Sequence, residues 1–184
     1  MNFDFSEEQN LLIQTTSTFV KNELTQYEEL LEKTNNLPKE LYEEIKKKSR
    51  EIGLYACNMP KEHGGGGLNA FDLTLVEKEL GHTSLALAEI AWRPQNILMA
   101  CKDDLVGEYL KPATTGERKD CIAMTEPEAG SDLRSMKTIA VKSGNDWIIN
   151  GTKNLFLMLI YQILLFSLPP QERMNKEEIY SHAF

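Results

Sequence analysis

One change in the spacing of apolar residues, near Asp120, limits the folds open to this chain of 184 residues. Before this point apolar residues recur every three or four positions, which is typical of amphipathic helices. After it, short apolar runs at residues 138–141 and 147–149 flank the turn-forming residues 143–146, and this pattern predicts a β-hairpin. Helices followed by antiparallel strands predict the α+β class.

The first part of the chain carries start and stop signals for several helices. Ser6 followed by Gln9 fits a capping box, in which polar side chains bind the free N–H groups at a helix start. Pro38 suits the first position of a second helix, and Gly53 suits the left-handed position just past its end. Further helices are expected at residues 70–80, 84–91 and 103–112.

Charge and cysteine content exclude some functions. The sequence has 28 acidic and 20 basic residues and a net charge of −8, which argues against non-specific binding of nucleic acid. Cys57, Cys101 and Cys121 form no C-x-x-C pair, and neither His63 nor His82 has a metal-ligating partner at a useful spacing, so no metal site is expected. The acidic N-terminus lacks the basic and apolar regions of a secretory signal, which favours a cytoplasmic protein with reduced thiols.

Two stretches could bind phosphate. The first is the run of four glycines at positions 64–67, but it lacks the Lys-Ser/Thr pair of a phosphate loop, and a plain surface loop is favoured. The second follows a short apolar strand that begins at Cys121 and stops before Pro127. There Gly130 can take positive φ or admit a ligand close to the backbone, and a turn at Ser131 can point N–H groups outward, which suits a pyrophosphate.

The acidic residues of this second stretch oppose that interpretation. Glu126, Glu128 and Asp132 have the wrong charge to surround a phosphate, and they would have to point away or pair with Arg134 and Lys137. Judged on composition alone, an acidic link between a strand and a turn is the favoured interpretation.

A pair of sequence strings changes this balance. Residues 124–132 read M-T-E-P-E-A-G-S-D, and residues 147–153 read W-I-I-N-G-T-K. Together they resemble the flavin-binding signature of the acyl-CoA dehydrogenases. Residues 53–54, 59–65 and 77–81 are also similar to that family, and the resemblance extends over about residues 1–153.

The resemblance implies a division into domains. Residues 1–118 would form the all-α N-terminal domain of the family, and residues 119–153 the start of its antiparallel middle β domain. The family's C-terminal four-helix bundle has no counterpart in this chain. Residues 154–184 form an apolar and then charged tail outside the resemblance, and we interpret it as a truncated or frameshifted reading, because a shifted frame can encode a family-like strand there.

The resemblance also implies a chemistry. Family members use FAD to remove two hydrogens from the α and β carbons of acyl-CoA thioesters, in fatty-acid or amino-acid catabolism. A glutamate in or near the bundle takes the α-proton, and the β-hydrogen leaves as hydride to the flavin. An electron-transfer flavoprotein is the implied partner, and a homo-oligomer is the implied assembly. Alone, this polypeptide is expected to lack dehydrogenase activity and to hold FAD weakly or not at all.

Carried over residue by residue, the resemblance assigns cofactor contacts but no catalytic residue. The backbone around Ile122 and Met124, with Thr125, would contact the flavin ring. Gly130 and Ser131 would meet the pyrophosphate, or Ser131 the bound acyl-CoA. No catalytic glutamate is assigned, and Glu126 is not a substitute for it.

Two other classes of function remain open. The chain could be a non-catalytic interaction module whose apolar tail docks a partner. It could also be a peripheral membrane protein anchored through residues 155–168, although a stretch of this length falls short of the ~20 residues of a membrane helix. Neither class accounts for the two strings.

Overall fold

The computed structural model describes residues 4–92, 94–144, 146–154 and 165–166, and the chain divides into two compact units. One unit comprises the chain up to Asn96 together with Thr114–Gly116, and the other comprises Ile97–Ala113 and the chain from Glu117 onward. The two are described separately below.

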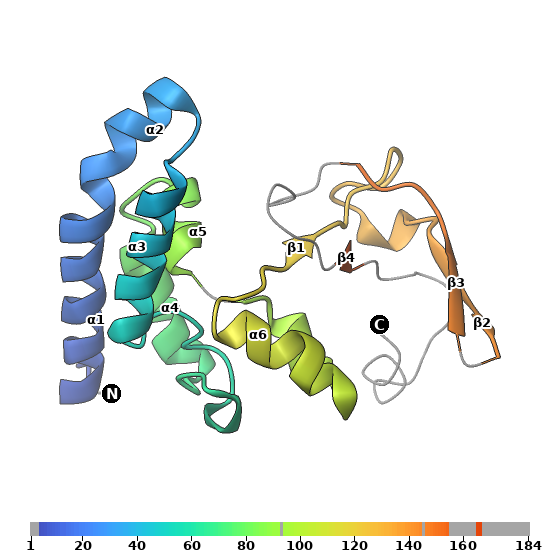
Figure 1. The fold of residues 1–184 in the computed structure, drawn as a ribbon, viewed down its shortest axis with the longest axis horizontal. Helices are drawn as coiled ribbons and strands as arrows, with labels where there is room; N and C mark the ends of the chain where they lie inside the picture. Colours follow the sequence, from blue (N-terminus) through green and yellow to red (C-terminus); the bar gives the residue numbers. More distant parts are fainter. Residues whose placement is uncertain (1–3, 93, 145, 155–164, 167–184) are drawn as a thin grey trace. The chain divides into compact units, whose positions relative to one another are not determined.

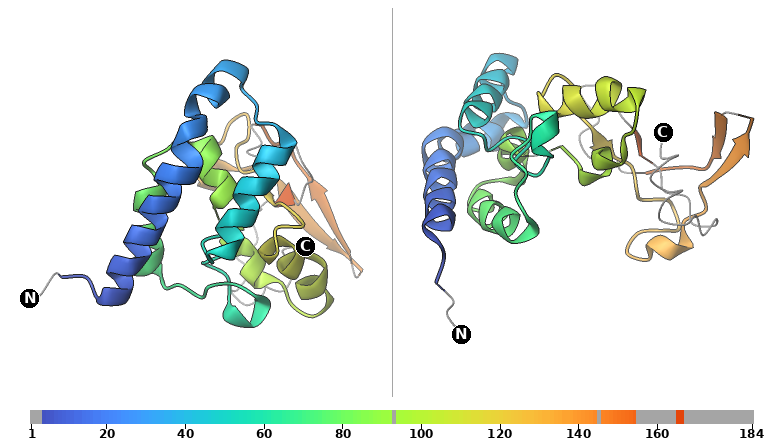
Figure 2. Two further views of the ribbon diagram at one scale, coloured as in Figure 1. Left: turned by 60° about the vertical axis from the view of Figure 1, so that its left-hand side comes forward. Right: turned by 90° about the horizontal axis from the view of Figure 1, so that it is seen from below.

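The first unit is helical. Its helices are α1 (Glu7–Phe19), α2 (Glu28–Thr34), α3 (Lys39–Glu51), α4 (Ala70–Leu80) and α5 (Leu85–Ala91). Helix α1 packs on α4, and α3 packs on α5 (Figure 1; Figure 2). Apolar side chains between these helices form the core, which includes Phe19, Leu24, Ile45, Val76, Leu87 and Ile90.

The helix ends follow the local signals of the sequence. The N–H of Gln9 donates to Ser6 Oγ at 3.1 Å, and the N–H of Ser6 donates to Gln9 Oε1 at 3.0 Å, so the predicted capping box is confirmed. Gly53 has a φ of +72° just past the end of α3, as predicted. Pro38 is the residue before α3 rather than its first residue, and this prediction is wrong by one position.

The segment after α1 was not foreseen. The chain continues from α1 into a π-helical turn, Val20–Leu24, then a 3₁₀ turn, Thr25–Tyr27, and then α2. Val20 and Leu24 are both buried in the core, so the wider turn keeps their side chains on the inner face. Apolar spacing alone does not distinguish such a turn from an ordinary helix.

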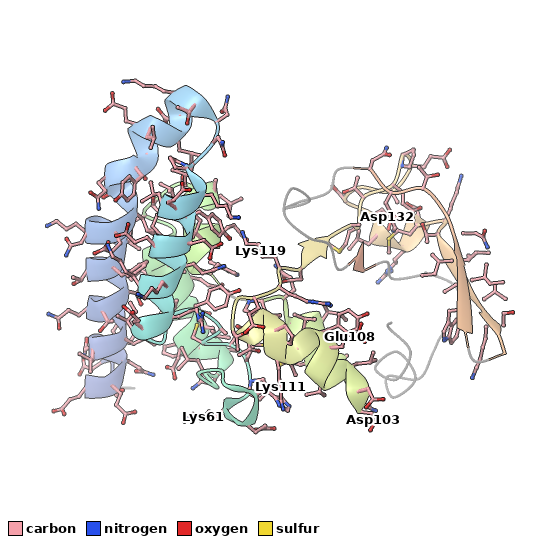
Figure 3. All side chains as sticks on the ribbon, viewed as in Figure 1. Lys61, Asp103, Glu108, Lys111, Lys119 and Asp132 are labelled. Atoms are coloured by element: carbon pink, nitrogen blue, oxygen red, sulfur yellow. The ribbon has the colours of Figure 1, made fainter. Side chains whose placement is uncertain are left out.

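The glycine run between α3 and α4 is a packed loop. The N–H groups of all four glycines donate to backbone carbonyl groups of residues 56–61, so none can cradle a phosphate. A Cβ on Gly65 would lie 2.1 Å from the carbonyl oxygen of Met59, and one on Gly66 would lie 2.8 Å from the Cα of Cys57. Close backbone packing therefore requires glycine at positions 65 and 66, and φ values of +89° and +62° favour it at positions 64 and 67. This agrees with the plain loop that the sequence favoured. Lys61, labelled in Figure 3, lies on the same loop.

In the second unit, helical turns precede strands. A π-helical turn, Val106–Leu110, leads into α6 (Lys111–Thr114), so the helix predicted to end near Pro112 continues through it. Strand β2 (Ile139–Ser143) pairs antiparallel with β3 (Asp146–Asn150), with Val141 opposite Ile148 (Figure 1). The predicted α+β class, helices followed by antiparallel strands, is confirmed.

The ends of this unit contain two departures from expectation. Strand β1 (Cys121–Ile122) pairs in parallel with β4 (Leu165–Phe166), within the apolar stretch whose structure the sequence left open. Asn150-Gly151 is a type I′ turn signal, but neither residue has positive φ, so no such turn forms. A Cβ on Gly151 would instead lie 2.1 Å from Thr138 Oγ1, which explains the glycine by close packing. The rest of the tail lies outside the described residues.

The described residues lack two further kinds of functional element. None of their helices is both long enough and apolar enough to cross a membrane. No group of three or more His, Cys, Asp or Glu side chains among them is arranged to hold a metal ion.

Candidate functional site

The turn after β1 is closed by short-range backbone bonds. The N–H of Glu126 donates to the carbonyl oxygen of Ala129 at 2.9 Å. In return, the N–H of Ala129 donates to the carbonyl oxygen of Glu126 at 3.2 Å. The N–H of Asn154 donates to the carbonyl oxygen of Thr125 at 2.8 Å, which ties the chain after β3 to the start of the turn. The two sequence strings, distant in the chain, therefore meet in space.

Glu126 lies at the centre of this arrangement. Its side chain is only 4% exposed, and Lys153 Nζ lies 2.8 Å from Oε1. The N–H of Thr138 donates to Oε1 at 3.1 Å, and the N–H of Lys137 donates to Oε2 at 2.6 Å. The bond from Lys153, with those from Thr138 and Lys137, lowers the pKa of Glu126 from 4.5 to about 2.

Lys153 also binds the backbone beside the turn. Its Nζ donates to the carbonyl oxygen of Met124 at 3.1 Å and lies 3.3 Å from the sulfur of Met136. Its side chain is 9% exposed. A buried ammonium is stable only with such partners, because burial without them favours its neutral form. The sequence analysis missed this role, and the only available signal was the lysine in the second string.

The other two acidic residues of the turn are also engaged. Glu128 forms an ion pair with Lys137, as the sequence analysis required. Asp132 Oδ1 accepts from the N–H of Arg134 at 3.1 Å and so begins the 3₁₀ turn Leu133–Ser135 (Figure 3). Glu126 and Glu128 are thus each neutralised by a lysine, whereas Asp132 keeps its negative charge beside the turn.

The predicted site residues are placed as follows. Ile122 lies in β1, Met124 is exposed, Thr125 is half-buried, and Gly130 and Ser131 are exposed. Within the part of the chain that the structure describes, no acceptor binds the N–H groups of Met124, Thr125, Gly130 or Ser131. The turn therefore presents free backbone donors on both sides of Glu126.

Gly130 has no structural reason to be glycine. Its φ is not in the left-handed region, and a Cβ built on it would meet nothing within 4 Å. Of the two reasons that the sequence offered, positive φ is excluded, and close approach of a ligand remains. Free N–H donors beside an open glycine suit the oxygens of a phosphate or pyrophosphate, and the residues present therefore fit a dinucleotide cofactor.

A cleft of about 520 Å³ in the helical unit is a weaker candidate. It lies at the end of α3, and its lining includes Lys47, Arg50, Glu51 and the glycine run. Two cations favour an anion, but the negative end of the α3 helix dipole disfavours one. Lys47 also lies 3.9 Å from Glu51. The turn after β1 is the better-supported site.

Comparison with known protein families gave two matches along the chain. Residues 6–117 match the profile "Acyl-CoA dehydrogenase, N-terminal domain". Residues 121–158 match the profile "Acyl-CoA dehydrogenase, middle domain". The second match includes both strings that meet at the turn.

Individual relatives agree with these profiles. Benzylmalonyl-CoA dehydrogenase of Aromatoleum aromaticum is 31% identical over 160 residues, which are 83% of this chain and 41% of that protein. Mitochondrial isovaleryl-CoA dehydrogenase of Pongo abelii is 33% identical over 156 residues, which are 80% of this chain and 36% of that protein. The chain thus spans less than half of the length of these relatives.

Solved structures resemble the chain in fold. An acyl-CoA dehydrogenase of Geobacillus kaustophilus superposes with a TM-score of 0.72 at 24% identity, over 96% of this chain and 46% of that one. An acyl-CoA dehydrogenase of Bacillus anthracis complexed with FAD superposes with a TM-score of 0.71 at 25% identity, over 89% of this chain and 28% of that one. With the profile matches over both units, these likenesses establish that the chain belongs to the acyl-CoA dehydrogenase family.

Proposed function

We propose that this chain forms part of an FAD-dependent enzyme that removes hydrogen from the α and β carbons of acyl-CoA thioesters. The observation that carries the proposal is the turn after β1, with its free N–H groups, its open Gly130 and its engaged acidic side chains. The likeness to an acyl-CoA dehydrogenase complexed with FAD supports the cofactor. When bound, FAD would supply the acceptor for the hydride.

The residues of this chain would bind and orient the cofactor. The backbone at Ile122 and Met124, with Thr125, would face the flavin ring. The N–H groups of Gly130 and Ser131 would donate to the pyrophosphate, and Ser131 is also a candidate contact for the acyl-CoA. Glu126 would not act as the base, because its carboxylate is buried and its pKa of about 2 makes it a weak proton acceptor.

Several parts of the proposal go beyond the chain itself. A relative from Acetobacterium woodii is a subunit of a caffeyl-CoA reductase–Etf complex, which supports an electron-transfer flavoprotein as the partner. The homo-oligomer, the cytoplasmic setting and the domain boundaries after residues 118 and 153 stay predictions. If the chain were an interaction module or a membrane anchor, that function would not explain why the two sequence strings are in contact.

A matched pair of glycine variants tests cofactor binding. Both Gly130 and Gly107 lack positive φ, and a Cβ on either meets nothing within 4 Å. We expect the 184-residue chain to bind FAD weakly, Gly130→Ala to weaken that binding, and Gly107→Ala to leave it unchanged. Equilibrium dialysis with millimolar FAD measures this. Equal binding by the two variants would contradict the proposed site.

Activity provides a second test. We expect no oxidation of acyl-CoA by the chain alone with an artificial electron acceptor, because none of its described glutamates is placed as the base. Turnover by the purified chain would show that the base lies within these 184 residues.

A further inference from the structure

Lys153 controls the direction of one peptide group at the candidate site. Its Nζ binds the carbonyl oxygen of Met124, which therefore points toward the buried ammonium. The described residues contain no cis peptide bond, and in a trans peptide the C=O and the following N–H point in opposite directions. The N–H of Thr125 must then point away from Lys153.

The N–H of Thr125 is available for a ligand. It binds no acceptor within the described stretches, whereas the carbonyl oxygen of Thr125 is held by the N–H of Asn154 at 2.8 Å. The peptide groups before and after Thr125 are thus both held by hydrogen bonds through their carbonyl oxygens, and the N–H of Thr125 is left without an acceptor. A free donor on a fixed backbone is suited to an electron-rich atom of a bound molecule, because little conformational freedom is lost on binding.

Glu126 keeps Lys153 in place. The carboxylate is itself anchored by the N–H groups of Lys137 and Thr138, so the ammonium is held between an anchored anion and the Met124 carbonyl oxygen. A lysine side chain has several rotatable bonds, and it orients a peptide group only when its head is fixed in this way.

We propose that Lys153 is a positioning residue, which holds the Met124–Thr125 peptide group so that its N–H meets a polar edge of the flavin ring. This inference rests on the proposed function for the identity of the ligand. The orientation of the peptide group, however, is a property of the chain without ligand. An experiment can therefore contradict the orienting role of Lys153 or the identity of the ligand independently.

Four variants separate positioning from folding. Lys153→Met removes the bond to Met124 but leaves Glu126 without its cation. The double variant Glu126→Gln/Lys153→Met removes both charges together, and its amide oxygen can accept from one of the two N–H groups, of Lys137 and Thr138, that the carboxylate binds. Glu126→Gln alone removes the anion that fixes Lys153 Nζ, and it should therefore loosen the bond of Lys153 to Met124. Lys137→Met, which breaks only the exposed pair with Glu128, is the control for lost charge.

The first measurement needs no flavin. In ¹H–¹⁵N spectra of the full chain, we expect the Thr125 amide resonance to shift in Lys153→Met, in Glu126→Gln and in the double variant, and to stay near its wild-type position in Lys137→Met. An unchanged Thr125 resonance in a folded double variant would overturn the inference, whether or not the chain binds FAD.

The second measurement concerns the ligand. We expect the double variant to bind FAD about tenfold more weakly than the wild type, which is the loss of one well-aligned hydrogen bond, and Lys137→Met to bind it nearly as well as the wild type. Equal FAD binding by the wild type and the double variant would also overturn the inference. Absence of FAD binding by the wild type, with the Thr125 shift present, would contradict the proposed function instead.

Discussion

The backbone at Gly151 passes so close to Thr138 that a Cβ at position 151 would lie 2.1 Å from Thr138 Oγ1 and 2.7 Å from its Cα. Residue 151 follows β3 directly, and residue 138 precedes β2 directly. This contact brings the two open ends of the hairpin together beside the turn that we propose as the cofactor site.

Gly151→Ala should therefore destabilise the second unit. The inserted methyl group meets the Cα and Cβ of Thr138, which no side-chain rotation can move away, and overpacking of this kind costs about 2 kcal/mol or more. Urea denaturation followed by circular dichroism measures the loss. Gly144→Ala in the hairpin loop is a useful comparison, because its Cβ meets nothing within 4 Å and only the φ of +65° is strained. A smaller loss for Gly151→Ala than for Gly144→Ala would contradict the close contact.

The glycine run should also reject side chains for reasons of packing. Gly65→Ala would place a Cβ 2.1 Å from the Met59 carbonyl oxygen, and we expect a loss of about 2 kcal/mol or more in the free energy of unfolding. Gly107→Ala, in a helical turn and facing open space, should raise that free energy by about 0.5–1 kcal/mol. Thermal denaturation of both variants tests the contrast, which would be refuted if Gly65→Ala were as stable as the wild type.

Stability should depend on pH through Glu126. Its pKa is lowered from 4.5 to about 2 in the folded chain. Because the folded pKa is the lower one, the carboxylate contributes stability that is present above about pH 4.5 and is lost as the pH falls toward about 2. We expect the free energy of unfolding to fall more steeply with acidification in the wild type than in Glu126→Gln. Urea titrations across this window measure both slopes, and parallel curves would speak against the buried pair.

The first helix should depend on its cap. Ser6→Ala removes the acceptor of the Gln9 N–H, and we expect a loss of about 1 kcal/mol in the free energy of unfolding. Thr15→Ala, at an exposed position inside α1, is the matched control and should leave stability unchanged or slightly higher. Chemical denaturation of the two variants would reveal the difference, and equal stabilities would mean that the cap is not formed in solution.

Local features of the fold could be predicted because their causes lie within a few residues. The capping box depends on Ser6 and Gln9 alone, and Gly53 is marked by its place after an amphipathic helix. The hairpin likewise follows from alternating residues around a turn. The π-helical turn after α1 was missed because the apolar pattern of an α-helix continues through it.

The site could be predicted only in part, because its contacts join residues that are distant in the chain. The free backbone N–H groups and the unobstructed Gly130 agree with the predicted anion-binding turn. Glu126, however, was expected to pair with Arg134 or Lys137, and its cationic partner is Lys153. The Asn150-Gly151 pair shows the limit, because a sequence does not distinguish a glycine needed for positive φ from one needed for close packing.

The buried pair also sets the order in which this region can be completed. During synthesis the ribosome makes Glu126, Lys137 and Thr138 well before Lys153. The Glu126 carboxylate therefore stays hydrated until Lys153 is available to pair with it. Only when the second string has emerged can the ammonium enter and the segments close together. Newly made chains that pause before this point would therefore expose a turn whose buried contacts have not yet formed.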